Sequence, residues 1–323
     1  MKGNNELQEK IQAAMAAYPF KTDPSNLYEP IRYILALGAK RMRPQLVLMG
    51  CDLFGGDVSL ALKPALGIEF FHNFTLMHDD IMDNAPLRRA RPTVHRKWNP
   101  NIAILSGDAM FVQSFELMME VNKDILKPVL SLFCKTATEV CEGQQLDMDF
   151  ETSGQVTISQ YLHMIGLKTA VLLAASLETG AMIAGAGNQD ASHLYDFGKN
   201  MGIAFQLQDD YLDVYGDSDK FGKQVGGDII SNKKTFLLLK AFELAGDPVR
   251  NELDNLLFHE KNMETKVEKV KKIYDSLGVK THSTQMIESC YQAAMRHLDA
   301  ISVPENQKKN LLDFAEMLLV REH

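Results

Sequence analysis

The sequence predicts an all-α protein, and three observations support this. Apolar residues recur at helical spacing in nearly every segment of the 323-residue chain. No run of alternating β-branched residues predicts a strand, and no low-complexity linker divides the chain. Most prolines and glycines are expected between helices, at positions that include Pro24, Pro30, Gly38, Pro44, Pro64, Pro86, Pro100, Gly143, Gly154, Gly187 and Gly216. We therefore expect residues 1–323 to form a single-domain helical bundle.

The composition is that of an ordinary globular protein, with 46% hydrophobic and 24% charged residues. A formal net charge of −8 argues against a nucleic-acid binder with a broad basic surface. The four cysteines have no C-x-x-C spacing, and no apolar signal core follows the polar N-terminus, so a cytoplasmic protein is expected. The most apolar stretch, residues 170–186, carries Glu178 and is expected to be a core helix, not a transmembrane segment.

The first predicted helix begins at Pro30 and ends at Gly38, and the next begins at Pro44. The joint between them carries Lys40, Arg41 and Arg43. Cations beside the N–H groups at the start of a helix attract phosphate. The same cations would also stabilise the negative C-terminal end of the preceding helix. The joint alone supports both interpretations equally.

Residues 71–83 are expected to form a helix, because apolar residues flank the acids and no breaker occurs before Pro86. Asp79, Asp80 and Asp83 then crowd one patch of that helix. Carboxylates so close together repel one another unless a cation lies among them, and they suit Mg²⁺. A solvated acidic face is the simpler explanation of one such cluster.

The same pattern returns at Asp209, Asp210 and Asp213, again after an apolar helical run. Two copies of an unusual acidic pattern suggest two faces of one metal-filled cavity.

Basic and polar residues accompany both clusters. Arg88 and Arg89 follow the first cluster and could pair with its acids or bind a diphosphate held by the metal. Lys168 and Thr169 open an apolar helix, where a lysine would either extend to solvent or hold phosphate. Asp108 is expected to act at a helix N-terminus. Gln144 and Asp147 share one helix face, Lys223 lies in a glycine-rich loop, and no chemistry is predicted after Asp247.

In this order the motifs resemble those of trans-isoprenyl diphosphate synthases, the polyprenyl synthetase family, from about Leu35 to Thr235. The resemblance implies an all-helical bundle around a deep central cavity, usually homodimeric. It implies condensation of isopentenyl diphosphate with an allylic diphosphate, using Mg²⁺ (three ions per site). Ala39 and Ala90 stand where family members commonly have glycine.

The resemblance also implies residue roles. The metal ligands would be Asp79, Asp80, Asp83, Asp209, Asp210 and Asp213, and the catalytic residues Asp79, Asp83, Asp209, Lys168 and Arg88. The substrate-binding residues would be Lys40, Arg43, His72, Arg88, Arg89, Lys168, Thr169, Gln206, Lys223 and Lys233.

Chain length would be set one and two helical turns before the first cluster, by Phe71, Phe74 and Thr75. Two bulky rings and one small residue suggest a blocked tunnel and a C15 or C20 product. Two other classes of protein compete with this prediction. A class I terpene cyclase would need no second diphosphate site, and a non-catalytic partner subunit would tend to lose an aspartate motif.

Overall fold

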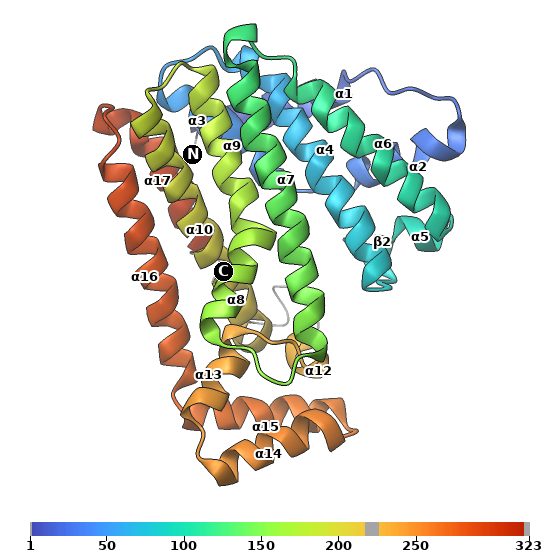
Figure 1. The fold of residues 1–323 in the computed structure, drawn as a ribbon, viewed down its shortest axis with the longest axis vertical. Coiled ribbons are helices and arrows are strands. Elements are labelled where there is room, and N and C mark those ends of the chain that lie inside the picture. The colour runs from blue at the N-terminus through green and yellow to red at the C-terminus, as the bar shows by residue number, and fades with distance from the viewer. Residues whose placement is uncertain (1, 217–225, 320–323) are drawn as a thin grey trace. The chain divides into compact units, whose positions relative to one another are not determined.

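The computed structural model describes residues 2–216 and 226–319, and helices make up nearly all of its regular structure (Figure 1). The all-α prediction is therefore confirmed. A single short hairpin, missed by the sequence analysis, is the only pair of strands in the described part of the chain.

The element bounds follow the chain in order. They are α1 (Lys2–Ala16), α2 (Ser25–Ala36), α3 (Met42–Leu53), α4 (Val58–Met82), β1 (Leu87–Arg88), β2 (Arg91–Pro92), α5 (Val94–Lys97), α6 (Pro100–Met118), α7 (Lys123–Thr152), α8 (Ile158–Ile165), the π-helix η1 (Gly166–Ala170), α9 (Val171–Ile183), α10 (Asn188–Tyr215), α12 (Gly227–Ile230), α13 (Phe236–Leu244), α14 (Asp247–His259), α15 (Met263–Ser276), α16 (Val279–Asp299) and α17 (Glu305–Leu319).

The chain divides into two compact units. Unit 1 comprises Met1–Cys134, Ala175–Leu194 and Ser302–Leu311, and unit 2 comprises Lys135–Ala174, Tyr195–Ile301 and Leu312–His323. Four of the boundaries fall inside α7, α9, α10 and α17, and the fifth, between Ile301 and Ser302, falls between α16 and α17.

Unit 1 is organised around α4, which packs along α6 and α3. Asp57 caps the start of α4 by accepting from the Ser59 N–H at 2.9 Å, and Asn99 caps α6 in the same way through Ile102. A buried cluster that includes Ile31, Phe70 and Met110 fills the space between these helices. This packing holds the C-terminal end of α4 in place, where the first acidic cluster lies.

Two glycines let α3 and α9 approach each other closely in unit 1. A Cβ at Gly50 would lie 2.2 Å from the Leu177 carbonyl oxygen, and one at Gly180 would lie 2.0 Å from that of Val47. Any larger side chain would have to push the two backbones apart.

Unit 2 has two hydrophobic clusters. One contains Tyr161 of α8, Leu207 of α10 and Phe236 of α13, and packs these helices together. The other joins Val214 and Val270 and holds α14 and α15, which lie side by side (Figure 1). α8 begins with a reciprocal capping pair between Thr157 and Gln160.

Several predicted breaks are wrong, because packing and upstream caps decide where these helices begin. Pro30 and Pro64 lie inside α2 and α4, whose first turns form earlier, at Pro24 and Asp57. Gly143 lies inside α7. Asp108 is in the middle of α6 and 3.9 Å from His78, so it does not cap a helix.

The segment Ile158–Ile183 is long and apolar enough to span a membrane, but 78% of its most apolar window is buried. A buried segment of this kind is what the sequence analysis expected of a core helix.

Candidate functional site

The first acidic cluster lies at the C-terminal end of α4, as the sequence predicted. Asp83 caps the helix, and its N–H donates to the Asp79 carbonyl at 2.9 Å. Asp79 is half-buried, Asp80 is buried and Asp83 is exposed. Three carboxylates at the negative end of a helix dipole are unfavourable by themselves, so this position favours a bound cation.

Arg88 supplies part of that positive charge. Its Nε donates to both carboxylate oxygens of Asp80 at 2.9 Å, and its Nη2 lies 2.7 Å from Asp80 Oδ1. The same Nη2 is 3.6 Å from Asp79 Oδ2. In this structure Arg88 therefore pairs with the acids, which was one of the two expected interpretations.

The hairpin β1–β2 carries Arg88 and Arg89 back toward α4. Leu87 pairs with Pro92 and Arg88 with Arg91. The two loop residues, Arg89 and Ala90, both have positive φ, of 52° and 58°. A two-residue hairpin turn needs this conformation, which is why glycine is common in such turns. Ala39, the other departure from the family pattern, is not among the positive-φ residues of the described chain.

A second group of predicted residues meets around His72. Arg43 Nη1 lies 3.2 Å from His72 Nε2. Arginine can only donate, so we assign Nε2 as the acceptor and the proton to Nδ1. Burial, followed by the charges of Arg43, Arg89 and Arg88, holds the His72 pKa well below its usual range. His72 is therefore neutral and adds no charge to this basic group.

The other cations of this region differ in their contacts. Arg89 Nη1 donates to the Leu37 carbonyl at 3.1 Å, and Arg41 Nη2 donates to that of Leu35 at 3.0 Å. Arg41 thus stabilises the C-terminal end of α2, which was the helix-dipole alternative. Lys40 is exposed in the segment that precedes α3.

Glu69 is a member of this group that the sequence analysis missed. It is buried at 3% exposure and accepts from Asn73 Nδ2 at 3.0 Å. Burial raises the pKa of Glu69 above its usual value, and the charges of Arg41, Arg43 and Arg89 offset only part of this rise. Glu69 precedes His72 by three residues, so helical spacing could have placed it on the same face.

Aromatic rings pack one and two turns before the acids of α4. Phe74 stacks on Phe111 at 5.0 Å between centroids, and Phe71 lies 5.7 Å from Phe74. Phe115 and Phe133 extend this group, with Phe133 5.3 Å from Phe71. We call Phe71, Phe74, Phe111, Phe115 and Phe133 the phenylalanine cluster. Thr75 lies beside it and donates to the His72 carbonyl at 2.8 Å.

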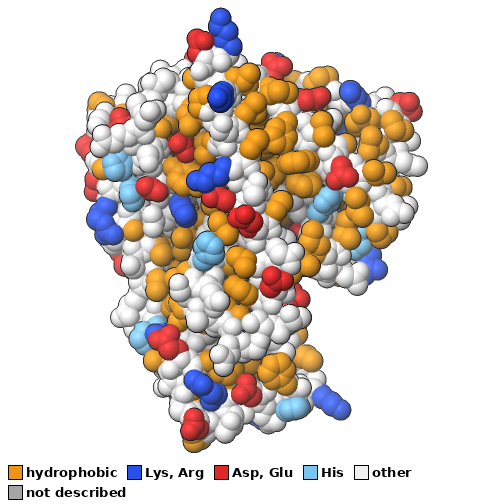
Figure 2. Space-filling view, in the orientation of Figure 1, with side chains coloured by type: hydrophobic (Ala, Val, Ile, Leu, Met, Phe, Trp, Pro, Cys, Tyr) orange, Lys and Arg blue, Asp and Glu red, His pale blue; other side chains and the backbone are white. Residues whose placement is uncertain are grey.

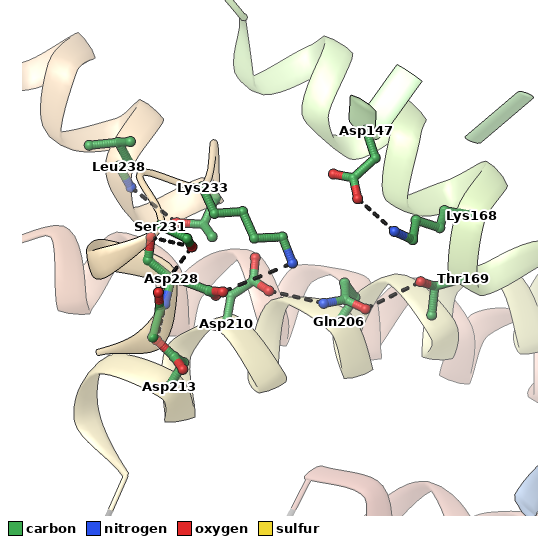
Figure 3. A network of polar contacts seen from close by, with 12 residues as sticks. Asp147, Lys168, Thr169, Gln206, Asp210, Asp213, Asp228, Ser231, Lys233 and Leu238 are labelled. Atoms are coloured by element: carbon green, nitrogen blue, oxygen red, sulfur yellow. Dashed lines mark hydrogen bonds and ion pairs between the residues drawn. The ribbon is translucent and has the colours of Figure 1, made fainter. Parts of the chain in front are cut away.

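The second acidic cluster lies on α10 in unit 2. Asp210 is buried and accepts hydrogen bonds from the Tyr161 hydroxyl and, at 2.9 Å, from Gln206 Nε2. Burial raises the Asp210 pKa to about 7, opposed mainly by Lys233. Asp209 is half-buried on the same helix. Gln206 also joins Asp210 to Thr169, whose Oγ1 lies 3.2 Å from Gln206 Oε1 (Figure 3).

Lys168 and Thr169 lie in the π-helix η1. Lys168 Nζ is 2.6 Å from Asp147 Oδ2 of α7 (Figure 3). A Cβ at Gly143 would lie 2.2 Å from the Lys168 backbone nitrogen, so Gly143 permits the two backbones to approach. π-helical turns inside α-helices often mark functional positions.

Asp213 holds the start of α12. Its Oδ2 accepts from the Asp228 N–H at 2.9 Å, and its carbonyl accepts from the Gly226 N–H at 2.7 Å. The Asp228 carboxylate in turn lies 4.0 Å from Lys233 Nζ (Figure 3). Lys223 lies outside the described residues.

The structure therefore brings the predicted residues together within each unit. Unit 1 joins Asp79 and Asp80 with Arg88, and His72 with Arg43. Unit 2 joins Lys168 with Asp147 and Asp210 with Gln206 and Thr169. Within residues 2–216 and 226–319, no three His, Cys, Asp or Glu side chains form a metal-binding group.

Tyr161 and Asp228 are further residues that the sequence analysis missed. Tyr161 precedes Lys168 by seven residues, two helical turns, and that spacing was an available signal. Asp228 follows Gly226-Gly227 and gave no signal of its own.

Comparison with known proteins identifies the family. Residues 24–277 match the family model described as polyprenyl synthetase. The chain is 41% identical to a geranylgeranyl diphosphate synthase of Methanosarcina mazei over 69% of each chain. It is 33% identical to a geranylfarnesyl diphosphate synthase of Natronomonas pharaonis over 98% of this chain and 96% of that one.

A solved structure agrees with these relatives. The crystal structure of a geranylgeranyl pyrophosphate synthetase from Pyrococcus horikoshii superposes with a TM-score of 0.90 and 35% identity, over 99% of this chain and 97% of that one. Together with the helical fold and the two acidic clusters, these matches establish that the chain belongs to the polyprenyl synthetase family.

Proposed function

We propose that this protein is a prenyltransferase that condenses isopentenyl diphosphate with an allylic diphosphate. The reaction releases diphosphate and gives a short-chain trans-prenyl diphosphate. The observation that carries the proposal is the family match over residues 24–277, in a chain that has both acidic clusters and pairs Arg88 with Asp80 of the first. The names of the relatives, geranylgeranyl and geranylfarnesyl diphosphate synthases, support the same reaction.

The carboxylates fit Mg²⁺ by their chemistry, because they are all-oxygen donors and lie, in α4, at the negative end of a helix. We assign the ions to Asp79, Asp83 and Asp209, with Asp80, Asp210 and Asp213 beside them, and expect three ions per site. When bound, Mg²⁺ stabilises the charge of the departing diphosphate as a Lewis acid.

The chain's own residues bind and orient the two substrates. Arg88, Lys168, Thr169, Gln206, Lys223 and Lys233 are assigned to the allylic diphosphate, and Lys40, Arg43, His72 and Arg89 to isopentenyl diphosphate. A neutral His72 suits this role, because its protonated Nδ1 can donate while Nε2 accepts from Arg43. Bidentate guanidinium groups match the oxygens of a diphosphate.

The phenylalanine cluster is our candidate for the end of the product tunnel. Phe74 lies five residues before Asp79, and Phe111, Phe115 and Phe133 pack around it and Phe71. Rings from three helices would block a growing prenyl chain, which supports a C15 or C20 product and not a longer one.

We propose a homodimer, formed through an exposed face of α6. Leu105, Val112 and Met119 are seven residues apart and 48% to 60% exposed, so they form one apolar stripe. Figure 2 shows hydrophobic side chains gathered on the surface over this helix. A stripe of this kind is usually covered by a partner. We further propose that residues 1–323 act as one cytoplasmic domain and that the apolar segment Ile158–Ile183 is a core helix and not a transmembrane segment.

One assay tests the reaction. The purified protein is incubated with isopentenyl diphosphate and each of the C5, C10 and C15 allylic diphosphates, with and without Mg²⁺, and the products are sized. We expect Mg²⁺-dependent C15 or C20 products. Products that form without isopentenyl diphosphate would indicate a cyclase, and the absence of any condensation would refute the proposal.

A further inference from the structure

Lys266 of α15 is a buried lysine whose partners all lie in unit 2. It is 2% exposed, and its Nζ donates to the Ile230 carbonyl at 3.1 Å, to Asn232 Oδ1 at 2.6 Å and to the Leu257 carbonyl at 3.2 Å. All three acceptors are neutral oxygens. Burial lowers the pKa of Lys266, and burying an ammonium group without a carboxylate is costly.

Two of these acceptors, in Ile230 and Asn232, lie where the short helix α12 ends in a defined turn. After α12, the Asn232 N–H donates to the Ile229 carbonyl at 3.2 Å and the Lys233 N–H donates to the Asp228 carbonyl at 2.9 Å. Asn232 has a φ of 58°. This is the double hydrogen-bond pattern of a Schellman motif, with Asn232 in the left-handed position and Lys233 directly after it.

The left-handed conformation of Asn232 therefore fixes where the Lys233 backbone leaves α12. Asparagine is one of the few residues that adopts this conformation readily. Lys266 stabilises this turn through two hydrogen bonds, one to the Asn232 side chain and one to the carbonyl of Ile230, the last residue of α12. Lys233 Nζ is 4.0 Å from Asp228, which the same motif positions.

We propose that Lys266 is a positioning residue that holds Lys233, which lies 4.0 Å from Asp228, in the geometry needed to bind the allylic diphosphate. The inference rests on the proposed function, which assigns Lys233 to that substrate. It assigns a role to a residue of α15, a helix in which the sequence analysis predicted no chemistry.

A purely structural role for Lys266 predicts a different result. Lys266 also binds Leu257 near the end of α14, so its loss lowers stability in either case. Only a positioning role makes the Michaelis constants of the two substrates respond differently, because Lys233 is assigned to the allylic diphosphate and not to isopentenyl diphosphate.

The test compares Lys266→Met with Lys272→Met. Methionine keeps much of the side-chain length and removes the charge and the donors. Lys272, on the same helix, is 71% exposed and pairs with Glu268. Michaelis constants for both substrates are measured at saturating Mg²⁺, with the melting temperature alongside. We expect Lys266→Met to raise KM for the allylic diphosphate about tenfold, the loss of one charge-assisted hydrogen bond, and to leave KM for isopentenyl diphosphate within about twofold. Lys272→Met should change neither.

A second variant tests the route through the turn. Asn232→Gly keeps the left-handed backbone and removes one of the three acceptors of Lys266, the Asn232 Oδ1. We expect a smaller rise in the allylic KM, and little further rise when it is combined with Lys266→Met. If Lys266→Met does not fold, Asn232→Gly alone decides the matter.

Two results would overturn the inference: an unchanged allylic KM in the folded variants, or equal rises for both substrates. A wild-type protein that condenses no substrate pair would refute the proposed function itself, and this outcome is recognised before any variant is measured.

Discussion

Tyr161 of α8 donates a hydrogen bond through its hydroxyl group to the carboxylate of Asp210 on α10, and both side chains are buried. The pair joins residues 49 positions apart, so it links α8, which leads into Lys168, to the second acidic cluster. Gln206 completes the arrangement by donating to the other carboxylate oxygen. Asp210 is thus oriented by hydrogen bonds from two side chains of the protein.

We predict that Tyr161→Phe weakens metal-dependent activity. The variant keeps the ring and removes the donor, so the buried carboxylate loses a hydrogen bond worth about 1.5–3 kcal/mol. The half-saturating Mg²⁺ concentration should rise several-fold and the melting temperature should fall. Tyr291→Phe, on α16, is the matched control and should change neither quantity. An unaltered Mg²⁺ dependence would show that Tyr161 serves packing only.

The raised pKa of Asp210 predicts a pH-dependent stability. Because the folded-state pKa of about 7 lies above the value of 3.8 for an unperturbed aspartate, the protonated form is favoured in the folded protein. The stability that Asp210 contributes is full below pH 3.8 and is lost as the pH rises through 7, by up to about 4 kcal/mol.

Metal-free protein should therefore show this loss between pH 4 and 7 in urea titrations, and Asp210→Asn should flatten this part of the profile. A wild-type and variant pair with parallel profiles would contradict the shifted pKa.

The sequence predicted much of this site because its signals are local. The helix over residues 71–83 follows from apolar spacing and the absence of breakers, and its acids lie where expected. Asp147 and Lys168 were each identified separately, but only the fold shows that they pair. The sequence-based assignment of one cavity to both acidic clusters, one in each unit, stays a prediction.

Other features depend on tertiary structure and had no local signal. Pro64 was expected to break a helix, but the packing of α4 along α6 and α3 sustains the helix through it. The hairpin that carries Arg88 is only two residues long on each strand, too short to show alternation. Helical spacing could have placed Glu69 on the face of His72, but its burial, at 3% exposure, is seen only in the structure.

We predict that truncating the phenylalanine cluster lengthens the product. Phe74→Ala and Phe111→Ala each remove one ring of a stacked pair and open space beyond it. Each variant should yield products at least one C5 unit longer than the wild type, measured by chromatography of the dephosphorylated alcohols. Phe258→Ala, which truncates a phenylalanine that is 63% exposed on α14, should leave the product unchanged. Wild-type products of C30 or more, or unchanged lengths in both variants, would place the end of the tunnel elsewhere.

The turn at Ala90 predicts a stabilising substitution. Ala90 has a φ of 58°, a conformation that costs a residue with a Cβ about 1 kcal/mol. Ala90→Gly should recover much of that energy as a higher free energy of unfolding in urea. Ala36→Gly, at the end of a helix, should instead destabilise the protein. A loss of stability in Ala90→Gly would mean that the flexibility gained by the unfolded chain outweighs the strain that is relieved.

The contact between Gly143 and Lys168 predicts a substitution that separates two helices. A Cβ at Gly143 would lie 2.2 Å from the Lys168 nitrogen and 2.6 Å from its Cα, and neither backbone atom can rotate away. Gly143→Ala should therefore displace η1 from α7 and break the ion pair between Lys168 and Asp147, with a loss of allylic diphosphate binding. Gly154→Ala is the matched control, because nothing lies within 4 Å of its Cβ. A wild-type KM for the allylic substrate in Gly143→Ala would have two explanations: the Lys168–Asp147 ion pair survives the substitution, or it breaks and is dispensable. The double variant Gly143→Ala/Asp147→Asn distinguishes them. A higher KM in the double variant than in Gly143→Ala would show that the ion pair had survived.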